Sequence, residues 1–186
     1  FERLRGFDES HIGTCCHCTA GAVDRFIKAN HGARVGAGDL AGAEKALEAG
    51  IISTGGTPNL PNVGKLVGAT EHRAGTYIFN DRMMVACGAA TEDDCALHVY
   101  ATVVSRAGAD RGILDSGSKT LTADPGGGMD GYGHILEYPQ ARIGAFAEEH
   151  GFLDLSRTNE RPDVGEVVRI IPNHVCVVVN MVDQLI

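Results

Sequence analysis

Residues 170–180, IIPNHVCVVVN, form an apolar and mostly β-branched stretch near the end of the chain. This composition, with Pro172 near the start, predicts a buried strand. His174 and Cys176 are two positions apart, and a strand points such residues to the same face. One face would then present an imidazole and a thiol together, a pair suited to zinc. The alternative is a buried, hydrogen-bonded histidine beside a small apolar cysteine.

The first third of the chain has the pattern of an α/β fold. A short strand is expected around residues 4–7, and apolar spacing predicts a helix over residues 21–31. A second helix is predicted from Asp39, as its N-cap, to Ala49, with Gly50 closing it. Residues 51–53 then form a predicted strand that leads into the turn TGGTP. Helix, strand and Gly-rich turn in this order are typical of a parallel barrel or a doubly wound sheet.

The pattern changes after about Pro61. Segments rich in β-branched and aromatic residues alternate with Gly, Asp and Pro turns, which predicts a mainly β domain. Residues 96–104 alternate roughly with period 2, as a half-buried strand does. One further helix is predicted over Tyr138–His150, ending at Gly151. The predicted strands are residues 77–79, 96–104, 111–114 and 167–179.

Composition excludes several classes of partner. The net charge of −8, with 16 basic and 24 acidic residues, argues against binding to nucleic acid or an anionic membrane. No apolar run approaches the roughly 20 residues that cross a bilayer, and no signal-peptide pattern opens the chain. Six unevenly spaced cysteines do not suit a disulfide scaffold, so a reducing cytoplasm is expected. Because the chain starts at Phe1 without Met, we expect an excerpt of a longer protein.

The turn at residues 53–57 is a candidate phosphate site. Gly55 and Gly56 let backbone N–H groups approach an anion, and the hydroxyls of Ser53 and Thr57 can donate further bonds. The segment is neither a Walker A loop nor the dinucleotide-binding fingerprint. A plain Gly-Gly turn is the alternative.

Other polar residues are weaker candidates. Tyr77 stands where a turn enters a predicted strand, so it could donate to a ligand or lie in the core. Lys119 follows a predicted strand and could form a Schiff base, although a solvated turn lysine is the more usual case. The residues Cys15, Cys16, His17 and Cys18 are zinc-ligand types, but no second pair at a finger or ribbon spacing follows, which favours an irregular loop.

Six segments, in this order, resemble the D-threonine aldolase and D-serine dehydratase family. They match family patterns such as S-G-G-x-T-P, P-G-x-Y-x-F-x-D, L-D-A-G-S-K and P-N-H-x-C. The resemblance covers nearly everything after Gly50 and implies an alanine-racemase-like, fold type III scaffold. Residues 1–62 would be the C-terminal portion of a (β/α) barrel, and residues 63–186 a β-rich C-terminal domain. The matching segments are residues 53–58, 75–81, 103–106, 114–119, 148–151 and 171–176.

The resemblance implies pyridoxal 5′-phosphate as the cofactor. Ser53, Gly55, Gly56 and Thr57 correspond to the loop that holds its phosphate, and Tyr77 falls in a pattern near the cofactor. The family's Schiff-base lysine lies on the first barrel strand, in a pattern such as H-x-K-T-H-K that this sequence lacks. No catalytic residue is therefore assigned, and the chain alone is expected to be inactive. His11 falls roughly at a Gly-His turn of the family.

The resemblance also implies a metal pair, His174 and Cys176. The dehydratases bind zinc there, whereas members with Asp in place of the cysteine prefer manganese or a similar harder ion. Because a thiolate selects zinc, Zn²⁺ is expected, with Mn²⁺ or Mg²⁺ as the alternative.

The implied function is a metal-dependent lyase that uses pyridoxal phosphate on D-β-hydroxy-amino acids, and no nucleic-acid or membrane partner is expected. Its reaction would be dehydration of D-serine or D-threonine, or aldol cleavage of the D-threonine type, and Cys176 favours dehydration. A cytoplasmic homodimer acting on a small-molecule D-amino acid is expected. The alternatives are a metal-free fold type III amino-acid racemase and a non-catalytic fragment.

Overall fold

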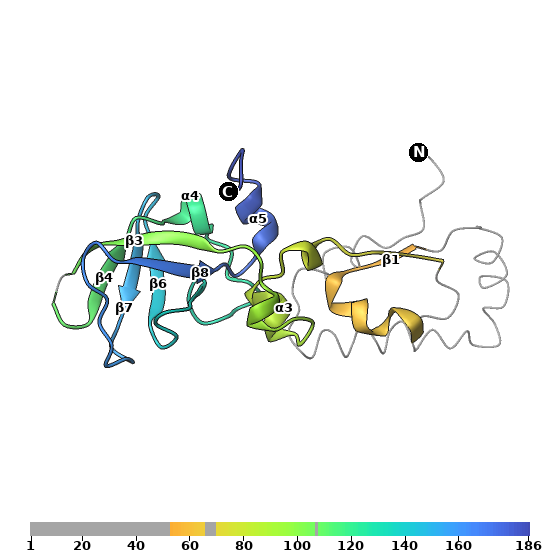
Figure 1. The fold of residues 1–186 in the computed structure, drawn as a ribbon, viewed down its shortest axis with the longest axis horizontal. Coiled ribbons are helices and arrows are strands. Elements are labelled where there is room, and N and C mark those ends of the chain that lie inside the picture. Colours follow the sequence, from red (N-terminus) through yellow and green to blue (C-terminus); the bar gives the residue numbers. More distant parts are fainter. Residues whose placement is uncertain (1–52, 66–69, 107) are drawn as a thin grey trace. The chain divides into compact units, whose positions relative to one another are not determined.

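The computed structural model describes residues 53–65, 70–106 and 108–186 (Figure 1). The chain divides into two compact units. The first unit holds the described residues through Tyr77 together with Ala86–Ala89, and the second holds Ile78–Val85 and Ala90–Ile186. The strand near residues 4–7, the helices at 21–31 and 39–49, His11 and the cysteine cluster at 15–18 lie outside the described residues. The domain boundary at residues 62 and 63 stays a prediction.

The first unit contains a parallel pair of strands. Strand β1 (Ser53–Gly55) pairs with β2 (Glu71–Arg73), and the 3-10 helix η2 (Thr57–Lys65) lies between them in the chain. A parallel pair needs a crossover connection, as an α/β unit provides. The strand predicted over residues 77–79 is wrong, because Thr76–Ile78 forms the 3-10 turn η3. The N–H of Tyr77 donates to the side chain of Thr57 instead of a neighbouring strand.

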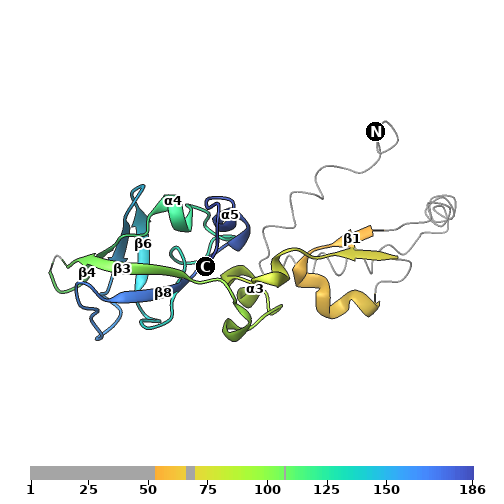
Figure 2. The same cartoon turned by 45° about the horizontal axis from the view of Figure 1, so that its top comes forward.

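The second unit is built on one six-stranded antiparallel sheet (Figures 1 and 2). The strands run across the sheet in the order β5-β8-β3-β4-β7-β6. Their bounds are β3 Val99–Ser105, β4 Arg111–Leu114, β5 His134–Ile135, β6 Arg142–Phe146, β7 Gly151–Asp154 and β8 Val167–Ile171. The short helices are α3 Arg82–Ala86, η4 Glu92–Asp94, α4 Ser118–Leu121 and α5 Val175–Val179.

The predicted alternation along β3 is confirmed. Val99, Ala101 and Val103 are buried, whereas Tyr100 is 69% exposed. Strand β4 was likewise predicted at its observed bounds. The buried faces of these central strands form the core with Ile170 and other aliphatic residues of the sheet. None of the helices in the described part of the chain has the length and apolarity that crossing a membrane requires.

The helix predicted over Tyr138–His150 is wrong, because this segment forms strand β6 and the turn into β7. The two strands pair antiparallel, and the N–H of Ala147 donates to the carbonyl of His150 across the turn. Ile143 is fully buried on the core side of β6. Cross-strand pairing over a short turn therefore outweighs the helix propensity of the alanines.

The strand predicted through residue 180 is wrong beyond Ile171, where β8 ends. Pro172 has no N–H to continue the ladder, and α5 begins at Val175. His174 is the N-cap of this helix and Cys176 lies inside it, so the two residues do not share a strand face. A run of valines is a poor helix former, which means that tertiary contacts impose the helix.

Candidate functional site

His174 is held by a carboxylate from a distant part of the chain. Its Nδ1 lies 2.7 Å from Oδ2 of Asp124, and its side chain is only 13% exposed. An ionised carboxylate only accepts hydrogen bonds, so Nδ1 carries the hydrogen and donates. The lone pair of a neutral imidazole then resides on Nε2, which is the atom available to a metal ion.

Asp81 positions the start of helix α5. This residue is fully buried, and its Oδ2 accepts the N–H of Val175 at 2.9 Å. Its Oδ1 accepts the N–H of Met84 in α3, also at 2.9 Å. Burial raises the pKa of the Asp81 carboxyl, and the backbone hydrogen bonds act in the opposite direction. One carboxylate thus joins the first turns of α3 and α5.

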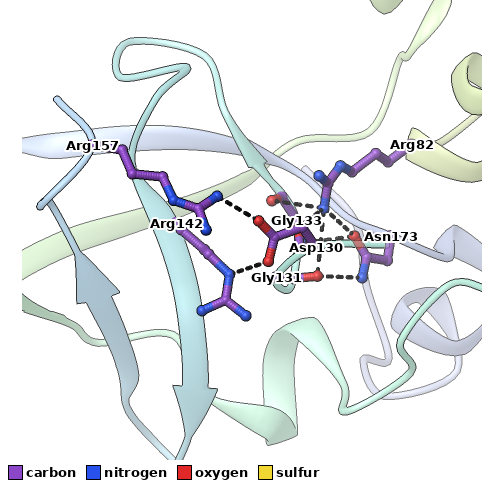
Figure 3. A network of polar contacts seen from close by, with 7 residues as sticks. All are labelled: Arg82, Asp130, Gly131, Gly133, Arg142, Arg157 and Asn173. Atoms are coloured by element: carbon purple, nitrogen blue, oxygen red, sulfur yellow. Dashed lines mark hydrogen bonds and ion pairs between the residues drawn. The ribbon is translucent and has the colours of Figure 1, made fainter. Parts of the chain in front are cut away.

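Asn173, directly before the histidine, is buried with all its amide atoms in use (Figure 3). Its Oδ1 accepts from the N–H of Gly133 at 2.9 Å and from Arg82 at 3.1 Å. Its Nδ2 donates to the carbonyls of Gly131 at 3.0 Å and Asp124 at 3.3 Å. The side chain therefore holds both ends of the glycine-rich segment 124–133 beside the candidate metal residues.

The same segment is fixed on its outer side by an ion-pair cluster, also drawn in Figure 3. The carboxylate of Asp130 accepts from Nε of Arg142, and from Arg157 at 2.6 Å. Hydrogen bonds from both arginines hold the pKa of Asp130 below its usual range. Because these groups are substantially exposed, the pairs orient the segment more than they stabilise the fold.

The candidate phosphate loop is shaped by its contact with strand β2. A Cβ on Gly55 would lie 2.9 Å from the carbonyl oxygen of Arg73, and Gly56 has a φ of +99°. The N–H of Gly56 donates to the same carbonyl at 3.0 Å, and its own oxygen accepts from Asn59 at 3.1 Å. Packing against β2 thus accounts for Gly55 and the positive φ accounts for Gly56, whose N–H is already engaged.

Thr57 carries two donors that this loop could offer to an anion. It is buried, and its Oγ1 accepts the N–H of Tyr77 at 3.0 Å, which brings these two predicted residues together. The hydroxyl hydrogen can still donate. The N–H of Thr57 opens η2, where a helix provides no carbonyl partner for it. The two donors fit a phosphate oxygen.

His174 and Cys176 are the side chains that could hold a metal ion here. In the described part of the chain, no three His, Cys, Asp or Glu side chains are grouped as ligands. His174 and Cys176 would supply one nitrogen and one sulfur, which are ligand types that zinc prefers. A catalytic ion keeps positions open for water or substrate, so a short protein ligand set suits that role.

Lys119 has the surface role that sequence analysis considered the more usual one. It lies in α4, is largely exposed and forms an ion pair of 2.6 Å with Glu149.

Sequence reasoning did not identify Asp81, Asn173 or Asp124 as site residues. The first two lie inside segments already matched to the family patterns, and Asp124 opens a Pro-Gly turn signal.

Comparison with known proteins finds relatives that are named as enzymes of D-amino acids. A family model described as "Putative serine dehydratase domain" matches residues 96–186. The D-threo-3-hydroxyaspartate dehydratase of Delftia sp. (strain HT23) is 33% identical over 161 residues, which are 75% of this chain and 42% of that protein. An uncharacterised protein of Mycobacterium tuberculosis is 38% identical over 112 residues, 58% of this chain and 84% of that protein.

Solved structures agree with these matches. The Delftia enzyme superposes with a TM-score of 0.71 and 28% identity, over 91% of this chain and 49% of that one. An alanine-racemase-like protein from Idiomarina loihiensis superposes with a TM-score of 0.71 and 26% sequence identity, over 91% of this chain and 48% of that one. The dehydratase has also been solved with one histidine replaced by alanine and, in the metal-free form, with a cysteine two positions further on replaced by alanine.

These matches define the scaffold as alanine-racemase-like, or fold type III, as the sequence predicted. The chain belongs to the D-threonine aldolase and D-serine dehydratase family, a family of lyases that act on D-amino acids. It spans about half the length of the solved relatives.

Proposed function

We propose that this chain forms part of a lyase that uses pyridoxal 5′-phosphate and a divalent metal ion on D-β-hydroxy-amino acids. The observation that carries the proposal is the contact of 2.7 Å between Oδ2 of Asp124 and Nδ1 of His174. This contact leaves Nε2 of the histidine to bind an ion, and Cys176 follows two residues later in the chain. The Delftia dehydratase, whose metal-free form carries a replaced cysteine, has a histidine and a cysteine at the same spacing.

The chemistry divides between two bound groups. Pyridoxal phosphate, when bound, takes up the electron pair left on Cα, and the metal ion polarises the β-hydroxyl oxygen as a Lewis acid. Nε2 of His174 and Sγ of Cys176 would hold the ion. The Asp124 carboxylate keeps the imidazole in the required orientation, and Asp81 keeps the helix backbone beneath it in place.

The phosphate would be held by the turn after β1. The N–H and hydroxyl of Thr57 are its donors, and Gly55 and Gly56 give the backbone the shape that presents them. Ser53 is proposed as a further member of this loop. Tyr77, which is 52% exposed and bonded through its N–H to Thr57, would lie beside the cofactor.

Zinc is the proposed ion, because a thiolate ligand selects it over manganese or magnesium. The proposed reaction is dehydration, in which the β-hydroxyl leaves after the α-proton is removed. Aldol cleavage, in which the β-hydroxyl is deprotonated and the Cα–Cβ bond breaks, is the alternative on the same ligands. We propose a cytoplasmic homodimer whose partner is a small D-amino acid, with no nucleic acid or membrane surface involved.

The test replaces Cys176 with alanine in the full-length protein. Cys176→Ala should lose zinc and lyase activity on D-serine, D-threonine or D-threo-3-hydroxyaspartate while keeping the absorbance of bound pyridoxal phosphate. The matched control is Cys87→Ala, which should keep zinc and activity. Full activity of Cys176→Ala without metal would refute the metal role, and racemisation that survives chelation would identify a racemase instead.

A further inference from the structure

We propose that Asp124 is the positioning residue of the metal site. Its carboxylate fixes His174 in the tautomer that carries the hydrogen on Nδ1, and this tautomer leaves the lone pair of Nε2 for the ion. This inference rests on the proposed function. The two side chains come from residues 50 positions apart in the chain and meet at 2.7 Å, at the junction between segment 124–133 and helix α5. Metal-binding histidines generally donate their other ring hydrogen to a carboxylate or a carbonyl.

The Asp124 carboxylate is itself held in place. Its second oxygen, Oδ1, accepts the N–H of Gly126 at 2.8 Å, and its backbone carbonyl accepts from Asn173 at 3.3 Å. Asn173 is the residue before His174. The chain thus ties Asp124 to α5 twice, once through the imidazole and once through the neighbouring amide, so the carboxylate cannot turn away without breaking other bonds.

The position of His174 in its helix also indicates a role toward a ligand. It is the N-cap of α5, yet its side chain makes no capping hydrogen bond. An N-cap side chain ordinarily accepts from an N–H in the first turn of its helix. Here the buried Asp81 accepts the N–H of Val175 instead. Because a separate carboxylate stabilises the helix start, the imidazole is left to Asp124 on one side and to a ligand on the other.

The second unit contains a matched pair for comparison. His134 lies 3.4 Å from the carboxylate of Glu92, and this histidine has no cysteine two residues further on. Glu92 is exposed, whereas Asp124 accepts further hydrogen bonds from Gly126 and Asn173. Glu92→Gln therefore controls for the general effect of removing a carboxylate beside a histidine.

The experiment measures zinc affinity by competition with a chromophoric chelator, using the full chain and its variants. Asp124→Asn keeps the shape of the side chain but removes the charged acceptor, and it should weaken zinc binding by roughly 10- to 100-fold. Glu92→Gln should bind zinc as the unmodified protein does. Equal affinity for Asp124→Asn and the unmodified protein would overturn the inference.

Failure of the proposed function is distinguishable from failure of this inference. If the unmodified protein binds no zinc, or if His174→Ala binds it equally well, the metal site itself is refuted.

A second measurement needs neither a variant nor a metal. Ring ¹⁵N shifts of His174 in the metal-free protein should show hydrogen on Nδ1. Hydrogen on Nε2 would overturn the role of Asp124 even if Asp124→Asn failed to fold.

Discussion

At the scale of single residues, the carboxylate of Asp81 joins the start of helix α3 to the start of helix α5. It is fully buried, and each carboxylate oxygen accepts one backbone N–H, one from α3 and one from α5. Replacing it by Asn would place an NH₂ donor against one of these N–H groups and leave that group unsatisfied. A buried unsatisfied donor costs about 1–3 kcal/mol.

Asp81→Asn should therefore lower the free energy of unfolding by about 1–3 kcal/mol, measured by urea unfolding. Zinc affinity should fall as well, because the helix that carries His174 and Cys176 loses an anchor. The control is Asp93→Asn in η4, where the side chain is exposed and little change is expected. Equal stability of the Asp81→Asn and unmodified proteins would show that α5 starts without this carboxylate.

The site residues were accessible from sequence to different degrees. The pair His174 and Cys176 was predicted from its spacing and from the family resemblance, but the strand geometry used to justify it was wrong. Asp124 could not be paired with His174 from sequence, because a contact between residues 50 positions apart depends on the folded sheet. The metal role itself stays a proposal.

At the scale of elements, local sequence patterns predicted correctly those strands that bury one face in the core. Strands β3 and β4 show the alternation that burial of one face requires, and they were predicted. The β6–β7 hairpin and helix α5 were missed, because tertiary contacts decide both. Strand β7 also pairs with the distant strand β4, and α5 is started by Asp81, 94 residues before Val175.

The glycine-rich segment 124–133 offers a test at this scale. Gly133 has a φ of +91°, and a Cβ there would lie 2.7 Å from Cγ2 of Ile170. Gly127 also has a positive φ, +79°, but a Cβ there would meet nothing within 4 Å. Both Gly→Ala changes introduce backbone strain of about 1 kcal/mol or more, and only the change at Gly133 adds a clash with the core.

Gly133→Ala should therefore destabilise the protein more than Gly127→Ala, by an additional amount of about 1–3 kcal/mol in thermal or urea unfolding. It should also weaken zinc binding, because the N–H of Gly133 donates to Asn173 beside the histidine. Equal destabilisation by the two changes would mean that the segment shifts to accommodate a side chain at Gly133.

At the scale of the whole molecule, the order of six short segments was more informative than any one of them. It identified the family and the fold type III scaffold, both of which the comparisons support. Single segments could not do this, because a Gly-Gly turn or a histidine near a cysteine is common in unrelated proteins. The structure adds the carboxylates that hold the pair in place, which no local pattern revealed.

The central claim is that His174 and Cys176 bind a catalytic zinc ion, and X-ray absorption at the zinc edge of the metal-loaded, full-length protein tests it most directly. The account predicts one sulfur ligand at about 2.3 Å and one imidazole nitrogen at about 2.0 Å, with lighter atoms completing the shell. The sulfur contribution should disappear in Cys176→Ala. A zinc shell without sulfur in the unmodified protein, or a protein that retains no zinc, would contradict the account.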